Sequence, residues 1–407
     1  MHSRPRPAVL ASFAAFVLVG ISSGVSGVLL PTQMASYRVD QATIGLMFFA
    51  GAGGFALAGL STGAVLHRLG TRVTLAAAAG VYTLAGLSLA MHPPFEAFLA
   101  AQLLGGFALG ILESVLNVYL AGLPNSTTLL NRLHAFWGAG ALLGPPLATW
   151  LLGFTAWTGV YLALALAFLP MAAIFLLVHP RGADGNSVPA EPSAVIENKT
   201  DNKRPQVNPG TQPASLLGSA LREPGILLGS VMLTVYVGLE LGVGNWVFSY
   251  LTRARDLPGP TAGYVVSAYW AGLTLGRFVI TPVAARLRVP VGRVVYGCLT
   301  GIAVATAVAW LLPTPVACVA LGLLGFCLGP VFPTTMSIAP RLTEEPLVPT
   351  AIGVMNSAST VGGSLLPWLM GVLTQAAGLH ALLPFALVLA IAQFAAWRPI
   401  APRTAAG

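Results

Sequence analysis

The chain has 407 residues, of which 56% are hydrophobic and 8% are charged, and its formal net charge is +8. Because an average soluble domain carries about 25% charged residues, this composition cannot cover a water-soluble surface. The 46 Gly and 31 Pro suit membrane helices, which tolerate both residues. The composition therefore excludes a soluble protein and predicts a polytopic α-helical membrane protein.

Twelve apolar segments follow one another along the chain, each of about 18 residues or more, which is long enough to cross a hydrocarbon core. We expect each segment to form one membrane-spanning helix. They cover 8–31, 42–66, 73–91, 96–121, 132–153, 156–178, 224–250, 261–283, 291–312, 315–339, 348–375 and 380–397.

The basic residues set the expected orientation. With both termini in the cytoplasm, every Lys and Arg lies on the cytoplasmic side except Arg38, Arg253 and Arg255 outside and Arg277 within a span. This asymmetry is what the positive-inside rule predicts for a multi-pass protein of a cell membrane. The basic excess is thus explained by topology, and we expect no nucleic-acid partner.

One long polar segment divides the chain. Residues 179–222 are rich in Pro, Asn, Lys and Glu, a composition typical of a flexible linker. We expect a six-helix bundle in residues 1–178, a cytoplasmic linker in 179–222 and a second six-helix bundle in 223–407.

The two halves also resemble each other. At a nearly constant offset in the sequence, glycines of the first half meet glycines of the second, as Gly20 meets Gly238, Gly54 meets Gly272 and the run 106–110 meets 325–329. Parallel six-helix repeats related by pseudo-two-fold symmetry, with a solute site between them, imply the major facilitator fold.

The loop between the second and third spans resembles the signature of the major facilitator superfamily. The family pattern combines glycines, an acidic residue and basic residues, and here His67 stands where the family usually has Asp. The resemblance implies a loop that locks helices together in one conformation, with a weaker or pH-dependent lock because of the His. The matching positions are Gly63, His67, Arg68, Gly70 and Arg72.

Two acidic residues lie deep within spans, where an ionisable group is expensive and is a site candidate by default. Glu113 and Asn117 are four residues apart on one face of the fourth span. A carboxyl in low dielectric accepts a proton more readily than in water, which is the property a proton-coupled symporter needs. The alternative is a carboxyl that pairs with a neighbouring group and holds helices together.

Glu240 lies in the seventh span among three glycines, followed by Asn245 and Trp246. This pattern favours a flexible helix with polar groups exposed to a cavity. We expect Glu240 and Asn245 to line the site, and the indole of Trp246 either to stack on a sugar ring or to anchor the membrane interface.

Further candidates lie on the fifth, eighth and eleventh spans. Arg277 either pairs with a buried carboxylate or anionic solute or extends to the cytoplasmic face. His134 can exchange a proton near neutral pH, and is either a gate residue or an interfacial one. The remaining candidates are Trp137, three residues after His134, Trp270, which can stack on the solute, and Asn356, the repeat partner of His134.

The motifs around Glu113–Asn117, 131–145, 236–251 and Gly276–Arg277 resemble the fucose–galactose–glucose:proton symporter branch of the superfamily. In fucose permease-like proteins the glutamate of the fourth span takes part in substrate recognition and proton coupling, and the resemblance implies that role for Glu113. The resemblance does not extend to the first span, where Gly27 stands at the position of an Asp that carries protons in fucose permease-like proteins.

These patterns predict a secondary transporter, not an enzyme, that moves a small polar, sugar-like solute by alternating access with proton coupling. Na⁺ is the alternative ion, since carboxylates and amide oxygens also suit it. The alternative functions are proton-driven export of amphipathic drugs and, from another class, a non-transporting receptor or scaffold. We expect a monomer in the lipid bilayer, without a metal or a cofactor.

Overall fold

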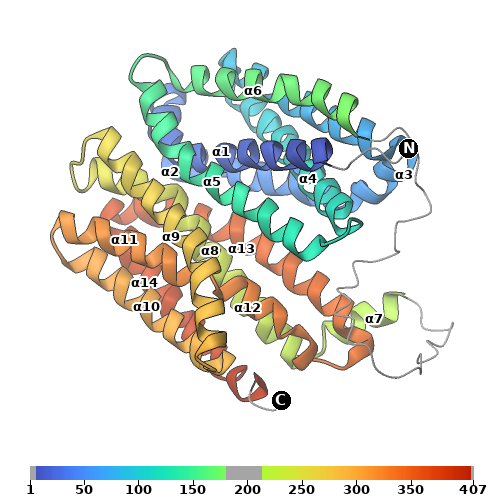
Figure 1. The fold of residues 1–407 in the computed structure, drawn as a ribbon. Coiled ribbons are helices and arrows are strands. Elements are labelled where there is room, and N and C mark those ends of the chain that lie inside the picture. Colours follow the sequence, from blue (N-terminus) through green and yellow to red (C-terminus); the bar gives the residue numbers. More distant parts are fainter. Residues whose placement is uncertain (1–5, 180–212, 405–407) are drawn as a thin grey trace.

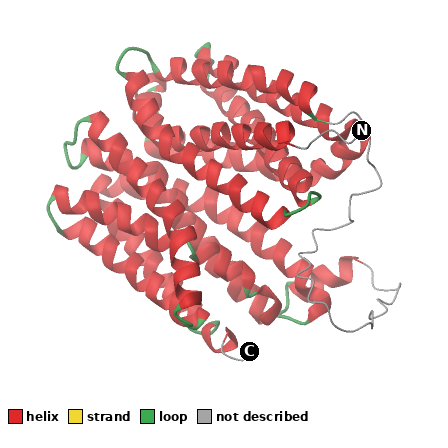
Figure 2. Cartoon of the chain, in the orientation of Figure 1, coloured by secondary structure: helices red, strands yellow, loops and turns green. Residues whose placement is uncertain are grey.

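The computed structural model describes residues 6–179 and 213–404, and every regular element in these ranges is a helix (Figure 2). The first half contains α1 (Arg6–Tyr37), α2 (Gln41–Ile44), α3 (Leu46–Ala90), α4 (Phe95–Ala121), α5 (Ser126–Leu152) and α6 (Trp157–Val178). α3 contains two spans, which are separated by a kink at Gly70, where φ is 71° and ψ is 164°. Such a positive φ suits glycine, which has no Cβ.

The second half contains α8 (Pro224–Arg253), α9 (Gly259–Arg286), α10 (Val291–Leu311), α11 (Thr314–Leu328), α12 (Val331–Ser337), α13 (Val348–Ala377) and α14 (Leu382–Trp397), with short 3₁₀ turns at 339–341, 345–347, 379–381 and 401–404. A short helix, α7 (Pro213–Ala220), precedes it. Most of the linker predicted at 179–222 lies outside the described residues, and α7 occupies part of the remainder.

Nine helices of the described ranges are long and apolar enough to cross a membrane, and the one over 41–90 has the length of two spans. α9 and α13, which contain more polar residues and prolines, fall outside that set but have 28 and 30 residues. Each predicted apolar segment thus corresponds to one helix, to half of α3, or to the α11–α12 pair. The expected all-helical, twelve-span architecture is confirmed.

The sequence repeat is also a repeat of contacts. A Cβ atom added at Gly54 would collide with the backbone of α4 at Leu103 and Phe107, and one added at Gly272 would collide with α11 at Gly322 and Phe326. The four contacted residues occupy equivalent positions in the two halves. The same close helix approach, which only small residues permit, is therefore built twice.

The halves meet on one side of the molecule. We call the side where α1 begins and α14 ends the terminal side, and the opposite one the far side. In Figure 1 the two bundles lie together at the far-side loops and diverge toward the N and C labels. Gly138 of α5 contacts Thr274 of α9. Between this contact and the terminal side, no hydrogen bond or ring contact joins the halves among residues 6–179 and 213–404.

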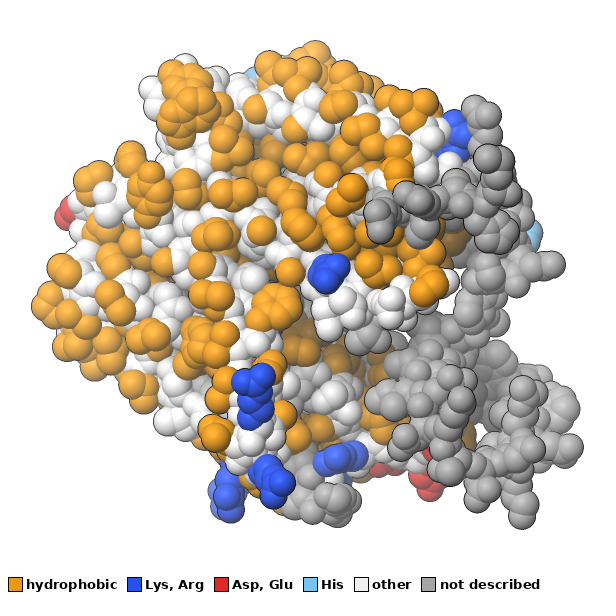
Figure 3. Space-filling model, in the orientation of Figure 1, with side chains coloured by type: hydrophobic (Ala, Val, Ile, Leu, Met, Phe, Trp, Pro, Cys, Tyr) orange, Lys and Arg blue, Asp and Glu red, His pale blue; other side chains and the backbone are white. Residues whose placement is uncertain are grey.

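The outer surface is apolar. Large hydrophobic side chains such as Leu60, Leu177 and Val319 are 86%, 80% and 65% exposed, and hydrophobic side chains cover the face in Figure 3. Most Lys and Arg side chains in that view lie toward the terminal side. A surface of this kind requires lipid around it, because a soluble protein rarely exposes large contiguous apolar patches.

Candidate functional site

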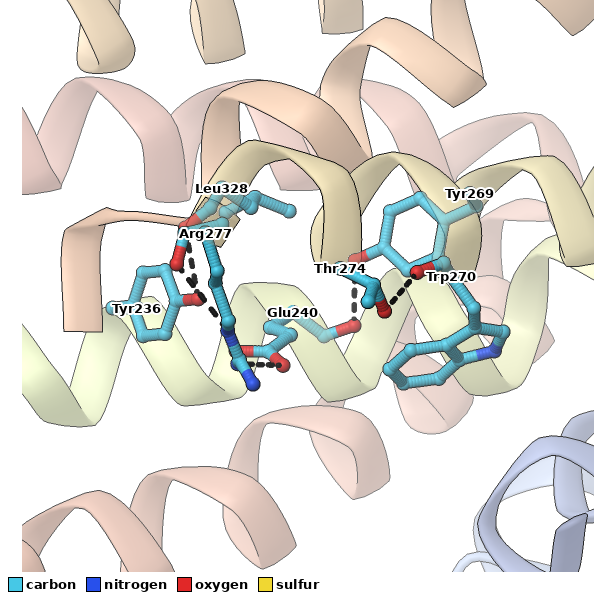
Figure 4. Close-up of polar contacts among 8 residues, drawn as sticks. Tyr236, Glu240, Tyr269, Trp270, Thr274, Arg277 and Leu328 are labelled. Carbon is cyan, nitrogen blue, oxygen red and sulfur yellow. Dashed lines mark hydrogen bonds and ion pairs between the residues drawn. The ribbon is translucent and has the colours of Figure 1, made fainter. Parts of the chain in front are cut away.

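The charged centre of the second half is an ion pair between neighbouring helices α8 and α9. Nη2 of Arg277 lies 3.4 Å from Oε1 of Glu240 (Figure 4). The Glu240 side chain is 9% exposed and that of Arg277 is 29% exposed. Arg277 therefore pairs with the buried carboxylate, as one of its two sequence-based interpretations predicted.

Hydrogen bonds to the backbone fix the surroundings of this pair. Nε of Arg277 donates to the carbonyl of Gly329 (3.3 Å), where α11 gives way to α12. The Tyr236 hydroxyl donates to the carbonyl of Leu328 (3.0 Å), and the Tyr269 hydroxyl donates to the Glu240 carbonyl (2.8 Å). Three helices, α8, α9 and α11, therefore position one acid and one base.

An aromatic pair lies between the halves, closer to the far side of the molecule than Arg277 is. The rings of Trp137 on α5 and Trp270 on α9 meet edge to face, with centroids 6.1 Å apart. The Trp270 ring packs on Gly244 of α8, where an added Cβ would lie 2.7 Å from it. One turn further along α9, Thr274 contacts Gly138. The structure thus brings these two predicted tryptophans together at the boundary of the bundles.

Trp246 and Asn245 occupy different environments. Trp246 is fully buried, and its indole N–H donates to the carbonyl of Pro367 (2.8 Å). In this conformation its ring is enclosed by protein and is neither at a membrane interface nor open to a solute. The amide of Asn245 donates to the carbonyl of Leu241 (2.8 Å) and is partly exposed.

Glu113 lies on a face of α4 that packs against α3. Gly106 and Gly110, on the same stripe, approach Gly51, Phe55 and Ala58 of α3 closely. The amide of Asn117 donates to the Glu113 carbonyl oxygen (2.8 Å). The Glu113 carboxyl itself is partly exposed and forms no hydrogen bond or ion pair with any described residue. At membrane depth a carboxyl without a partner needs either water or a bound proton.

His134 and Asn356 are both exposed. His134 is one turn from Gly138, toward the terminal side, and its ring packs edge-on against Phe16 of α1 at 5.8 Å. Asn356 is near the terminal end of α13. Both side chains lie in the part of the molecule where the halves diverge.

The superfamily-like loop motif is exposed on the terminal side. Gly63, His67 and Arg68 are exposed, and Gly70 and Arg72 are partly exposed. The side chains of His67, Arg68 and Arg72 form no hydrogen bond or ion pair with the described part of the chain. The lock that the motif implies is thus not formed with these residues in this conformation.

The contacts that close the far side were not predicted from the sequence. Nε2 of Gln375 on α13 donates to Oδ2 of Asp40 (2.8 Å), and Oε1 of Gln375 accepts from the Ala42 amide (3.0 Å). The indole of Trp368 donates to the Ala42 carbonyl (3.1 Å), and Arg253 donates to the Pro31 carbonyl (3.2 Å). The one sequence signal was Asp40 itself, a preferred residue at a helix N-terminus.

Chemically, the site offers carboxylates, a guanidinium, amides and indoles. The described residues contain no group of three or more His, Cys, Asp or Glu side chains that could hold a metal ion. The cysteines Cys298, Cys318 and Cys327 are free. These groups can form hydrogen bonds and ion pairs with a polar solute.

Two bundles of spanning helices, joined on one side and carrying few charged groups at their interface, define a solute transporter of the membrane. The family model of the Major Facilitator Superfamily matches residues 12–365 and 245–407. The chain belongs to that superfamily.

Curated relatives are distant. Bypass of stop codon protein 6 of Saccharomyces cerevisiae is 25% identical over 91% of this chain and 78% of that protein. A glucose/galactose transporter of Brucella abortus is 25% identical over 65% of this chain and 63% of its own length. A gallate transporter of Pseudomonas putida is 31% identical over 37% of this chain and 35% of that protein.

Solved structures share the fold. A bacterial homologue of the human lysosomal transporter Spinster, inward-facing and unoccupied, superposes with a TM-score of 0.75 at 14% identity, over 99% of this chain and 98% of that one. The fucose:proton symporter of E. coli superposes with a TM-score of 0.61 at 18% identity, over 96% and 98%.

Proposed function

We propose that this transporter imports a small polyhydroxylated solute together with a proton, and that Glu113 carries the proton. The observation that supports this most directly is the carboxyl of Glu113, which is inside a span, is partly exposed and has no partner among the described residues. Glu240, by contrast, is held by Arg277. One acid is therefore fixed in an ion pair, while the other is free to exchange a proton.

The contacts between the halves support alternating access. With both termini in the cytoplasm, as the basic residues favour, the far side is extracellular, and the bonds of Gln375 and Trp368 close it. The divergent terminal side then faces the cytoplasm. In this interpretation the conformation is the inward-facing one, and import requires the far-side bonds to break and re-form.

The class of solute is suggested by distant relatives. The Brucella relative is described as a glucose/galactose transporter, and the E. coli structure is described as a fucose:proton symporter. The partly exposed indole of Trp137 supplies apolar surface for the face of a ring, with the buried Trp270 packed against it. Asn245, Asn117 and Asn356 supply hydrogen-bonding groups. Rocking of the two bundles around such a site is the motion this architecture favours.

The test is uptake into proteoliposomes that contain the purified full-length chain. A panel of labelled sugars, sugar acids and polyols is offered with an inward proton gradient, with an inward Na⁺ gradient and with neither. We expect accumulation of at least one solute with the proton gradient alone. Accumulation that follows Na⁺ would contradict the choice of ion, and export of amphipathic dyes without sugar uptake would favour the exporter alternative.

The role of Glu113 is tested in the same vesicles. Glu113→Gln removes the titratable group with almost no change in size, so we expect exchange of labelled for unlabelled solute to continue while proton-driven accumulation is lost. Glu96→Gln is the matched control, because Glu96 is an exposed acid at the start of the same helix. Undiminished accumulation in Glu113→Gln would remove this residue from the coupling mechanism.

A further inference from the structure

The guanidinium of Arg277 has unused hydrogen-bonding capacity. Nε binds the Gly329 carbonyl and Nη2 contacts Glu240, and the Tyr236 hydroxyl also lies beside the guanidinium. The contact to Glu240 is single and 3.4 Å long, while charge-assisted N–H···O bonds are normally about 2.7–2.9 Å. Glu240 therefore orients Arg277 without saturating it.

A second basic side chain, from the other half, lies at the same level. Helices α5 and α9 run antiparallel, and Gly138 of α5 contacts Thr274 of α9. His134 is one turn from Gly138 and Arg277 is about one turn from Thr274, both toward the terminal side. Both side chains keep solvent exposure, just where the contact between the halves ends.

The charges around this point favour an anion. Arg132 lies near the start of α5, and Arg286 is the last residue of α9, so both exposed arginines are at the terminal ends of the two helices that carry His134 and Arg277. Glu240 is the one acid bonded to any of these four basic residues among the described residues. A cleft lined by one sign of charge raises the local concentration of the opposite ion.

We propose that the transported solute is a ring-shaped, hydroxylated carboxylic acid whose carboxylate binds Arg277. This proposal rests on the proposed function and narrows its solute class. The planar guanidinium fork matches a carboxylate with two parallel N–H···O bonds, which the single 3.4 Å contact to Glu240 does not supply. Trp137, which is partly exposed, provides apolar surface for the ring, and the buried Trp270, two turns along α9 from Arg277, supports it from behind.

The experiment compares acids with neutral molecules of the same shape. Binding to the purified full-length protein is measured by tryptophan fluorescence, without any ion gradient, for D-glucuronate against D-glucose, D-galacturonate against D-galactose, and 3-hydroxybenzoate against 3-hydroxybenzyl alcohol. We expect the acid of at least one pair to bind about 10-fold or more tightly than its neutral partner, the effect of one charge-assisted hydrogen bond.

The role of Arg277 is isolated by variants. Arg277→Gln is expected to remove the preference for the acid, and Arg277→Lys, which keeps the charge but not the fork, to reduce it. Arg293→Gln is the matched control and should keep the preference, because Arg293 is an exposed arginine of another helix, α10, whose side chain bonds no described residue. Size-exclusion profiles show which variants fold. If Arg277→Gln does not fold, the result for Arg277→Lys decides the test.

Three outcomes overturn the proposal: neutral partners that bind as tightly as the acids, an acid preference that survives in Arg277→Gln, or no binding of any acid by the unmodified protein. Because these titrations use no gradient, they are independent of proton coupling. A protein that binds the acids but does not accumulate them at acidic external pH would contradict the proposed function and leave the Arg277 site intact.

Discussion

The side-chain amide of Gln375 on α13 is bonded to Asp40, at the N-terminus of α2, across the boundary between the two halves, with 2.8 Å between Nε2 and Oδ2. The same amide accepts from the Ala42 N–H at 3.0 Å. One side chain of the second half thus holds two groups of the first half on the far side. In an alternating-access cycle both bonds must break when this side opens.

Replacing Gln375 is therefore expected to favour the conformation that is open on the far side. Gln375→Ala removes both bonds, and exposed hydrogen bonds of this kind contribute about 1 kcal/mol, or a factor of about five in the equilibrium. The distance between spin labels at Ala35→Cys and Ala377→Cys, in a background with Cys298, Cys318 and Cys327 replaced by Ser, measures the opening. An unchanged distance distribution would show that Gln375 does not stabilise closure.

Gln375→Glu should open the far side further than Gln375→Ala does. It places a second carboxylate beside Asp40, and like charges at this distance repel. Glu96→Gln, which changes an exposed acid on the same side that has no bonded partner among the described residues, is the control and should leave the distribution unchanged. If Gln375→Glu closes as tightly as the unmodified protein, the contact between Gln375 and Asp40 does not hold the far side closed.

The hydrogen bond between Gln375 and Asp40 should weaken only in strong acid. The hydrogen bonds from Thr43, from its side chain and its backbone N–H, lower the pKa of Asp40 below its ordinary value of 3.8, and the bond from Gln375 adds to the effect. Thr43 is in the same half as Asp40, so only the share of the lowering that comes from Gln375 depends on closure. That contribution is present above the ordinary pKa and is lost as pH falls through the lowered one.

Between about pH 5 and about pH 8 the spin-label distance should therefore not change through Asp40. Asp40→Asn should abolish the opening seen in strong acid, since Asn does not titrate. Opening that begins near neutral pH in the unmodified protein, and persists in Asp40→Asn, would assign the proton sensor to another group.

The glycine contacts predict a paired stability experiment. At Gly272 an added Cβ collides with the backbone of α11, whereas at Gly59 it meets no atom within 4 Å. Gly272→Ala is expected to destabilise the protein by about 1–3 kcal/mol, the usual range for overpacking. Gly59→Ala should be neutral or stabilising. Thermal unfolding of the detergent-solubilised protein measures both, and equal unfolding temperatures would contradict the close packing of α9 on α11.

Arg255 joins the far-side ends of α8 and α10. Its Nη2 donates to the Ala309 carbonyl (2.8 Å), its Nη1 to the Leu312 carbonyl (3.0 Å) and its Nε to the Tyr250 hydroxyl (2.7 Å). A cation bonded to the last carbonyls of a helix stabilises that end.

Arg255→Ala is therefore expected to lower the free energy of unfolding by about 1–3 kcal/mol. Arg293→Ala is the control, because Arg293 is an exposed arginine near the other end of α10 that bonds no described residue. Chemical denaturation followed by tryptophan fluorescence compares the two variants. A loss in Arg293→Ala as large as that in Arg255→Ala would mean that removal of charge, and not these bonds, lowers stability.

The sequence by itself determined the spans, the repeat and the small set of acids within the membrane. Hydropathy and charge act locally along the chain, so runs such as 42–66 and 348–375 were identifiable without any knowledge of their neighbours. The glycine series was likewise visible, because close helix contacts at equivalent places require small residues at equivalent positions.

Only the tertiary structure decided which polar group meets which. It pairs Glu240 with Arg277 and leaves Glu113 unpaired among the described residues. It encloses Trp246, whereas Trp137 meets Trp270. It also bonds Gln375 to Asp40 across the halves. The rotation of each helix and the conformation of the two bundles fix these contacts. Both depend on packing between segments far apart in the sequence, which local patterns of hydropathy do not contain.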